Sequence, residues 1–475
     1  MKGILFVLCA TLLLAGCGDG GDAPDKTKGK KTSGTHARGG GAKKFTDPQI
    51  EKLAAEANAL LEEGDYLRAK AKMTQAYAAF RGREVDDEAM QVFFLKGFCK
   101  VSDALREDDK AIKYAEEVLT TSKVDEDRIF AYGKLGAAYR RKGDFDKAVE
   151  NHQEAQTLAE KIHGENHPEV ALSYHQIGKV CHEQGDYVTA IAYHERAVRI
   201  WLETLGTKHP RIASAYHGTG AAYAGRGAYG RAITNYEAAL EIWIQALGEG
   251  HPDVATCRNN LGVALDRDGK TDEAVAQFEK ALRARINAFG PEHAEVAGCY
   301  NNLGTALDNK EMYDEAIESH GKALAIWLKV VGPNHPLVAT TYNNGAGTYS
   351  RKGDHDKAVE YYEKCLAIEL KTLDPEHPDV AITHNNLGNA YEKKDLPEKA
   401  VEHYEKCLAI ETKTLPADHP DLADSHYNVG KTYAKRKEKE KALEHLRKAR
   451  DIWRKKRGPE DPYVKNAQAM IEGLK

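Results

Sequence analysis

Apolar and small residues recur along most of the chain with the spacing of amphipathic helices. Between Ala255 and His293 they fall at intervals of three, four and seven residues, which places them on one face of a helix rather than on one face of a strand. The pattern breaks at Asp268-Gly269-Lys270, where glycine can adopt the positive φ that closes a helix. The segment therefore predicts two helices joined by a tight turn.

This two-helix pattern repeats every 42 residues. A His-Pro pair opens six copies, while His293-Ala294 and Asp461-Pro462 fill the equivalent places of two others. Proline suits the first turn of a helix, and the acidic residue that often follows it suits the positive end of the helix dipole. One position of the second helix is always alanine in eight copies: Ala148, Ala190, Ala232, Ala274, Ala316, Ala358, Ala400 and Ala442.

Ala69 and Ala111 extend the repeat upstream, so the chain holds about ten units, of which the first two are degenerate. A single helical hairpin is too thin to bury the surface that its folding requires, so neighbouring units must stack. A small rotation per unit then coils the stack and creates a concave face. We expect this face to be the binding site.

The sequence pattern of the repeat resembles the tetratricopeptide repeat. Leu261-Gly262, Leu265, Gly269, Ala274 and Phe278, with Ala281, occupy the signature positions of that family. The 42-residue length and the His-Pro-Asp-Val-Ala…Asn-Asn-Leu-Gly pattern resemble the kinesin light chain subtype. The resemblance covers roughly residues 46–474 and implies an all-α, right-handed superhelical solenoid of about ten hairpins with a C-terminal capping helix.

The N-terminus has the features of a secretory leader. Lys2 precedes a twelve-residue apolar run from Ile4 to Ala15, which is shorter than the ~20 residues that span a bilayer as a helix. The run ends Leu14-Ala15-Gly16-Cys17, which resembles the lipobox of bacterial lipoproteins. That resemblance implies cleavage before Cys17 and its acylation, and Gly18 after it favours the outer membrane. An ordinary leader with a chance cysteine is the alternative.

A basic, glycine-rich segment follows Cys17 and has no large apolar residue before Phe45. Such a segment cannot bury enough surface to order itself, so it is expected to be a flexible tether. Its lysines could contact anionic lipid or cell-wall polymer, or they could simply be solvated. The predicted divisions are a signal peptide at 1–17, a tether at 18–46, two degenerate units at 47–124, eight units at 125–461 and a capping helix at 462–475.

Charge and cysteine content exclude several partners. The chain carries 68 basic and 73 acidic residues, a net charge of -5, so it has no general attraction for nucleic acid. Its eight cysteines form no close CxxC pair, which argues against a metal knuckle or a disulfide scaffold. Cys257 and Cys299, like Cys365 and Cys407, are 42 residues apart. They occupy equivalent repeat positions and are expected to be buried thiols.

Paired asparagines recur inside the first helices, where asparagine is unfavourable and therefore needs a reason. In the family, the second residue of the pair lines the groove, and its amide binds the backbone or carboxylate of an extended peptide. The alternative is a ladder that satisfies the adjoining repeat. The resemblance thus nominates Asn260, Asn302, Asn344, Asn386 and Asn428 as peptide-binding residues.

Basic residues lie on or beside the same face, which suggests an acidic ligand segment. Acidic residues adjoin them, however, so the alternative is a set of solvated charges at the turns. The candidates for ligand contact are Arg267, Arg351 and Lys393, accompanied by Arg258, Lys431 and Lys435.

Other candidate chemistry is weak, and we expect no catalysis, no metal and no cofactor. The loop histidines occur once per repeat, so they are expected to lie about 10 Å or more apart. A metal ion shared between them would need each ligating nitrogen within about 2.1 Å of the ion. Gly430-Lys431-Thr432 imitates a phosphate loop, but Ser425 stands where glycine is required. One position of the second helices holds Trp201, Trp243, Trp327 and Trp453 but also Arg285, Glu369 and Glu411. That mixture predicts a position outside the deep core, used for packing or for aromatic contact.

The sequence therefore supports three hypotheses. The first is a lipid-anchored scaffold of the bacterial envelope that binds an extended segment of a protein partner. The second is a structural protein that self-associates through the edges or caps of the solenoid. The third is a cytoplasmic adaptor, which requires that the leader remain uncleaved.

Overall fold

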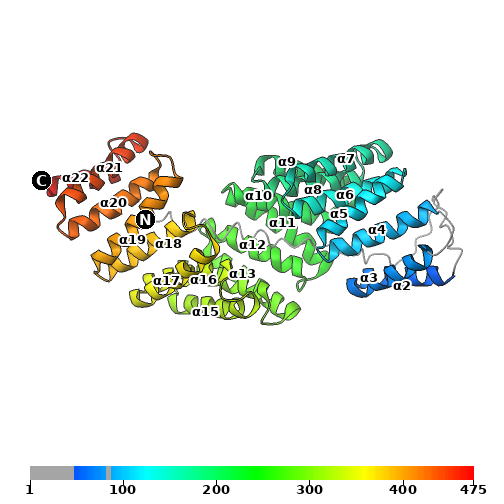
Figure 1. Cartoon of the computed structure of the whole chain (residues 1–475), viewed down its shortest axis with the longest axis horizontal. Coiled ribbons are helices and arrows are strands. Elements are labelled where there is room, and N and C mark those ends of the chain that lie inside the picture. The colour runs from blue at the N-terminus through cyan, green and yellow to red at the C-terminus, as the bar shows by residue number, and fades with distance from the viewer. Residues whose placement is uncertain (1–47, 82–86) are drawn as a thin grey trace. The chain divides into compact units, whose positions relative to one another are not determined.

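The structure is a computed structural model that describes residues 48–81 and 87–475. Within these residues it consists of 21 α-helices, with no strand (Figure 1). The helices are α2 (Pro48–Glu63), α3 (Tyr66–Arg81), α4 (Glu88–Ala104), α5 (Asp108–Thr121), α6 (Asp125–Arg141), α7 (Phe145–His163), α8 (Pro168–Glu183), α9 (Tyr187–Leu205), α10 (Pro210–Gly225), α11 (Tyr229–Leu247), α12 (Pro252–Arg267), α13 (Thr271–Phe289), α14 (Ala294–Asn309), α15 (Tyr313–Val330), α16 (Pro336–Lys352), α17 (His355–Thr372), α18 (Pro378–Lys393), α19 (Pro397–Thr414), α20 (Pro420–Lys435), α21 (Lys439–Arg457) and α22 (Pro462–Gly473). The predicted signal peptide, Cys17 and the tether lie outside the described residues.

The described helices form two compact units, residues 48–264 and residues 265–475, and the division falls within α12. In the first unit, α2 to α11 form five antiparallel hairpins, and each hairpin also packs on the next. In the second unit, α14 to α21 form four hairpins in the same way, and α22 packs against α21. Each helix chiefly contacts its neighbours along the chain, as expected for stacked repeats.

The starts of several first helices have a local cause that the sequence predicted. The histidine before a first helix is its N-cap, and its Nδ1 accepts a hydrogen bond of 3.2–3.3 Å from the backbone N–H two residues later. The prediction that these histidines are capping residues is therefore confirmed for His167, His209, His293, His335, His377 and His419.

The turn within each hairpin needs a left-handed residue. Gly353 supplies it with φ +93°, whereas Glu311, Asp395 and Lys437 adopt φ of 56–63° at the same repeat position. A side chain in this conformation costs roughly 1 kcal/mol relative to glycine. The turn is thus dictated by the packing of the two helices, and glycine is its least costly occupant.

Close helix approach explains the repeated small residues. The second-helix alanine is fully buried in each of the eight copies. On the facing first helix, a Cβ added at Gly388 would lie 2.5 Å from the ring of Tyr404, and one at Gly178 would lie 2.7 Å from the ring of His194. Glycine therefore makes room for a ring from the second helix.

None of the described helices combines the length and the apolar character that crossing a membrane requires.

Candidate functional site

The paired asparagines of the second unit form a ladder of hydrogen bonds between successive first helices. In each case Nδ2 of the second asparagine donates to Oδ1 of the first asparagine in the preceding repeat, 43 residues earlier. We call this set the asparagine ladder; its bonds are Asn344 to Asn301 at 3.3 Å, Asn386 to Asn343 at 3.2 Å and Asn428 to Asn385 at 3.1 Å.

The same register occurs in the first unit at Asn260, which the sequence analysis had also nominated. Asn260 Nδ2 lies 3.0 Å from Nε2 of His217 on α10. His217 occupies the position of the first asparagine, so an imidazole nitrogen replaces the amide oxygen as hydrogen-bond partner. His217 could not be recognised by comparing asparagines alone, because this repeat carries histidine at the position of the first asparagine.

A ladder bond uses only part of the hydrogen-bonding capacity of an asparagine amide. A bond through Nδ2 uses one of the two N–H hydrogens and neither lone pair of the carbonyl oxygen. Asn386 is buried, as is Asn302, whereas Asn260, Asn344 and Asn428 are half-buried. These contacts support the ladder interpretation of the asparagines, and their role in peptide binding stays a prediction.

The basic candidates are largely engaged within the chain. Arg351 forms an ion pair with the buried Asp308 of the preceding first helix. Lys431 and Lys435 both lie 2.9 Å from the carboxylate of Glu392, and they hold its pKa below the usual value although burial opposes them. Lys393 is exposed. The positive charge of this face is therefore mostly balanced before any ligand binds.

The two remaining basic candidates lie near the division of the chain. Arg267 is half-buried at the end of α12, and it takes part in interactions of its own. Arg258 is buried and forms an ion pair with Glu249. Neither guanidinium is thus a spare charge awaiting a ligand.

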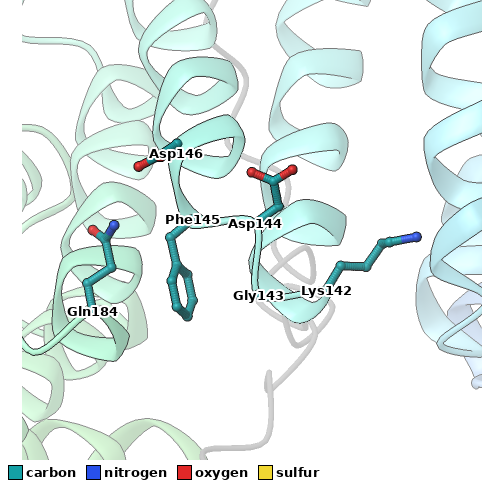
Figure 2. A pocket seen from close by; sticks show the side chains of 6 residues that line it. All are labelled: Lys142, Gly143, Asp144, Phe145, Asp146 and Gln184. Carbon is teal, nitrogen blue, oxygen red and sulfur yellow. The ribbon is translucent and has the colours of Figure 1, made fainter.

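A shallow depression of about 490 Å³ lies in the first unit beside the turn between α6 and α7 (Figure 2). Lys142 forms an ion pair with Asp109, and Asp144 caps α7 by accepting from the N–H of Lys147 at 3.3 Å. Lys142 and Asp144, two polar residues that line the depression, are therefore already engaged in contacts within the chain. The lining residues are Lys142, Gly143, Asp144, Phe145, Asp146 and Gln184.

The described part of the chain contains no group of three or more His, Cys, Asp or Glu side chains that could hold a metal ion. The six cysteines within it are free and buried, which confirms the prediction of buried thiols. Burial raises the pKa of the Cys99 thiol to about 12, so this group is not a nucleophile at neutral pH.

The tryptophan position corrects one prediction. Trp201 and Trp453 are 0% and 1% exposed, so the position belongs to the deep core, contrary to the sequence analysis. Glu369 at the same position is only 9% exposed, and burial raises its pKa to about 7. The mixture of tryptophan and glutamate therefore reflects a core that accommodates a protonated acid, not a position near solvent.

Three histidine pairs also escaped the sequence analysis, which weighed only the loop histidines. In each pair, one histidine lies on the first helix of a hairpin and the other on the second helix, and their Nδ1 atoms are 2.9–3.1 Å apart. A recurring separation of 19 residues was the available signal. The pairs are His175 with His194, His384 with His403, and His426 with His445.

Comparison with known proteins agrees with this architecture. The signature of the family described as Tetratricopeptide repeat matches residues 127–203, 180–239, 212–287, 296–371, 346–413 and 379–455. A second signature with the same description matches residues 259–327. Together they cover well over half of the 475 residues. No curated protein sequence matches the chain.

Among solved structures, the apo form of RapI aligns with a TM-score of 0.58 at 14% identity, over 77% of this chain and 98% of RapI. A Rap protein complexed with competence and sporulation factor gives a TM-score of 0.50 at 14% identity, over 79% and 99% of the two chains. At these identities the similarity concerns the fold alone.

The nearly identical TPR-like repeats described as a kinesin light chain of Podosopora anserina share 28% identity with this chain, with a TM-score of 0.40, over 44% of it and 98% of their own length. The stacked hairpins, the capping histidines between them and the family signature all indicate the same repeat. The repeats are those of a protein–protein interaction scaffold, and the chain belongs to the tetratricopeptide repeat family.

Proposed function

We propose that this protein is a lipid-anchored scaffold that binds an extended segment of a partner protein along the first helices that carry the asparagine ladder. The observation that carries the proposal is the row of amides on α16, α18 and α20, each fixed by a bond to the preceding repeat. An amide both donates and accepts, which suits the main chain of a peptide whatever its side chains are.

The ladder prepares these amides for binding. A side chain held by one hydrogen bond loses less conformational entropy when it forms another. Asn386 and Asn428 each keep a second N–H and a carbonyl oxygen beyond their ladder bond. The ladder and the peptide site are therefore compatible, because the same amide can serve both.

The charge pattern indicates which ligands this face selects. Arg351, Lys431 and Lys435 are paired within the chain, so an acidic ligand would have to compete with internal carboxylates. Recognition accordingly rests on main-chain contacts, and binding should depend only weakly on salt. The Rap protein complexed with competence and sporulation factor supports the proposal, because that protein has a similar fold and was crystallised with a factor.

The test compares two double variants that break the same ladder bonds. N386A/N428A removes the proposed peptide-binding amides, whereas N343A/N385A removes only their acceptors. Crosslinked capture of the partner from membranes should fall about tenfold or more for N386A/N428A, because two hydrogen bonds of about 1 kcal/mol are lost. Capture should persist for N343A/N385A. Equal capture by both variants would contradict the proposal, provided that helical circular dichroism is unchanged.

The membrane anchor is proposed from Cys17, with attachment at the outer membrane of a bacterial cell envelope. Mass spectrometry of the membrane-bound protein should find an N-terminal Cys17 that carries acyl chains. An intact Met1 and an unmodified Cys17 would instead support the cytoplasmic adaptor.

Self-association is the second candidate, and one observation favours it. Four large apolar side chains, 39–47% exposed, lie near the ends of the second helices α13, α15 and α17. Mass that rises with concentration in light scattering, without a partner, and that returns to the monomer value in L328K/L370K would support this function. The side chains are Phe289, Leu328, Val330 and Leu370.

A further inference from the structure

Two consecutive repeats of the second unit hold histidine pairs at the same position. His384 on α18 faces His403 on α19, with 3.0 Å between their Nδ1 atoms. His426 on α20 faces His445 on α21, with 2.9 Å between the Nδ1 atoms. Both pairs recur 42 residues apart, so two repeats present the same arrangement.

The surroundings of the pairs are repeated as well. The ring of Tyr391 stacks on His403, with 5.4 Å between ring centroids, and its hydroxyl donates to Glu363 at 2.7 Å. The ring of Tyr433 lies 6.1 Å from that of His445 at a tilt of 40°, and its hydroxyl donates to Glu405. The charged groups that act on the first pair are Glu402, Glu363, Lys406 and Lys399, and those that act on the second are Glu444, Glu405 and Lys448.

The distance between the facing nitrogens matches the bite of one metal ion. With metal–nitrogen bonds of about 2.05 Å, nitrogens about 3.0 Å apart subtend an angle of roughly 95° at the ion. Tetrahedral coordination would require nitrogens about 3.3 Å apart, so these pairs fit tetragonal geometry better.

Each of the two pairs has at least one half-buried ring: His403 in the first, and both His426 and His445 in the second. His384 is buried, whereas in the remaining pair both His175 and His194 are buried. Burial lowers the pKa of His384 and of His426 to about 4.

We propose that His384 with His403, and His426 with His445, are two chelating sites for a divalent transition ion of tetragonal geometry, with Cu²⁺ bound in preference to Ni²⁺. Two imidazoles supply adjacent equatorial ligands, and water completes the shell. The order of the ions follows the affinity series of N-donor sites. With two protein ligands per ion, binding is reversible, unlike that of a closed structural zinc site.

Binding of a metal ion to a pair requires one proton to move within one imidazole ring. In the metal-free pair, one imidazole carries its proton on Nδ1 and donates it to the other Nδ1. Coordination through both Nδ1 atoms moves that proton to Nε2 of the same ring. Both rings stay neutral, so metal uptake at pH 7.5 releases no proton from the pair.

The test uses the full chain and Cu²⁺ titration by calorimetry at pH 7.5. The preceding repeat carries Tyr342 and Tyr361 at the two positions of the pair, packed edge to face at 5.3 Å. Tyrosine can therefore be accommodated at these two positions of the repeat. H403Y and H445Y should each lose one bound ion, and the double variant should lose both. The control H419N removes an N-cap histidine that asparagine can replace, and its stoichiometry should not change.

Two further readouts separate chelation from a simple hydrogen bond. Electron paramagnetic resonance of the Cu²⁺ complex should show two imidazole nitrogens per ion, and the binding enthalpy should not vary with the ionisation enthalpy of the buffer. Stoichiometry unchanged in folded H403Y/H445Y would overturn the proposal. So would spectra with a single nitrogen.

Discussion

The same core position is built in two ways in different repeats, as one repeat from each unit shows. In the first unit, Trp201 fills it with an apolar ring, packed among residues such as Ile212, and its Nε1 donates to the carbonyl of Pro168 at 3.2 Å. In the second unit, Glu369 fills it with a carboxyl group that accepts from the thiol of Cys365 at 3.3 Å. One repeat geometry thus accepts an aromatic ring or a protonated acid.

The comparison of these repeats shows that the residues packed around this core position change together with the residue that occupies it. Cys365 replaces the alanine that most repeats carry four residues earlier, and Thr383 lies 3.8 Å from its sulfur on the next helix. Glu411 repeats this set with Cys407 and Ser425. Arg285, the third kind of occupant, lies 2.9 Å from Glu295 and donates to Cys299 at 3.1 Å. Polar occupants are therefore accepted because polar partners surround them.

The largest effect should come from removing the aromatic occupant. W201A should lower the free energy of unfolding of the first unit by about 3–5 kcal/mol, because a large cavity forms in the deep core. E369A, the matched change in the second unit, should cost far less and should stabilise the second unit above pH 8. Hydrogen exchange of the amides in α9 and α17 follows the two units separately. Equal losses in both variants would show that the two occupants are energetically alike.

Much of the fold could be predicted from the sequence, because its causes are local. The 42-residue period, the turn glycines and the His-Pro caps are encoded within one repeat, and the helices begin and end where these signals predict. The contacts between repeats were not predictable in the same way. The bond from Asn386 to Asn343 depends on how far one first helix is shifted along the next, which no single repeat encodes.

Histidine and tryptophan positions show the same limit. The pairing of His384 with His403 requires knowledge of which faces of a hairpin meet. The burial of Trp453 was missed because a shared position was judged by its most polar occupant, Glu369, whose carboxyl group has a buried partner in Cys365 one helical turn earlier. The candidate peptide site rests on the family resemblance and on the ladder geometry.

A second prediction uses the raised pKa of Glu369. Folding holds this carboxyl protonated up to a pKa of about 7, whereas the unfolded chain ionises it near 4.5. The stability that the protonated acid contributes is full below pH 4.5 and is lost as the pH rises through about 7. By pH 8 the loss should reach roughly 3 kcal/mol.

The control is E369Q, which keeps the shape and removes the titration. Urea unfolding of the second unit between pH 6 and pH 8.5 should show a smaller pH dependence for E369Q than for the wild type, and E369Q/E411Q should show the smallest. An identical slope in all three proteins would mean that these carboxyls ionise freely in the folded state.

The smallest effect lies on the acid side of the first unit, where His152 packs against Gly136 as Tyr404 packs against Gly388. Burial, assisted by the charges of Arg140 and Lys179, lowers the pKa of His152 to about 3. The unfolded chain takes up a proton near pH 6.5 that the folded chain refuses, so stability falls as the pH drops below 6.5. The loss due to His152 should be roughly 2 kcal/mol at pH 5.

H152Y installs the ring that the Gly388 repeat already accommodates, so it should fold and should lose that part of the acid sensitivity. Hydrogen exchange of the α6 and α7 amides, compared at pH 5 and pH 7 after correction for intrinsic rates, measures the difference. If H152Y and the wild type lose the same stability, acid sensitivity must come from other groups, and the aromatic and histidine versions of this position would be energetically equivalent. A selective gain would show that the first unit tolerates polar core occupants only while they stay neutral, as the second unit does with Glu369.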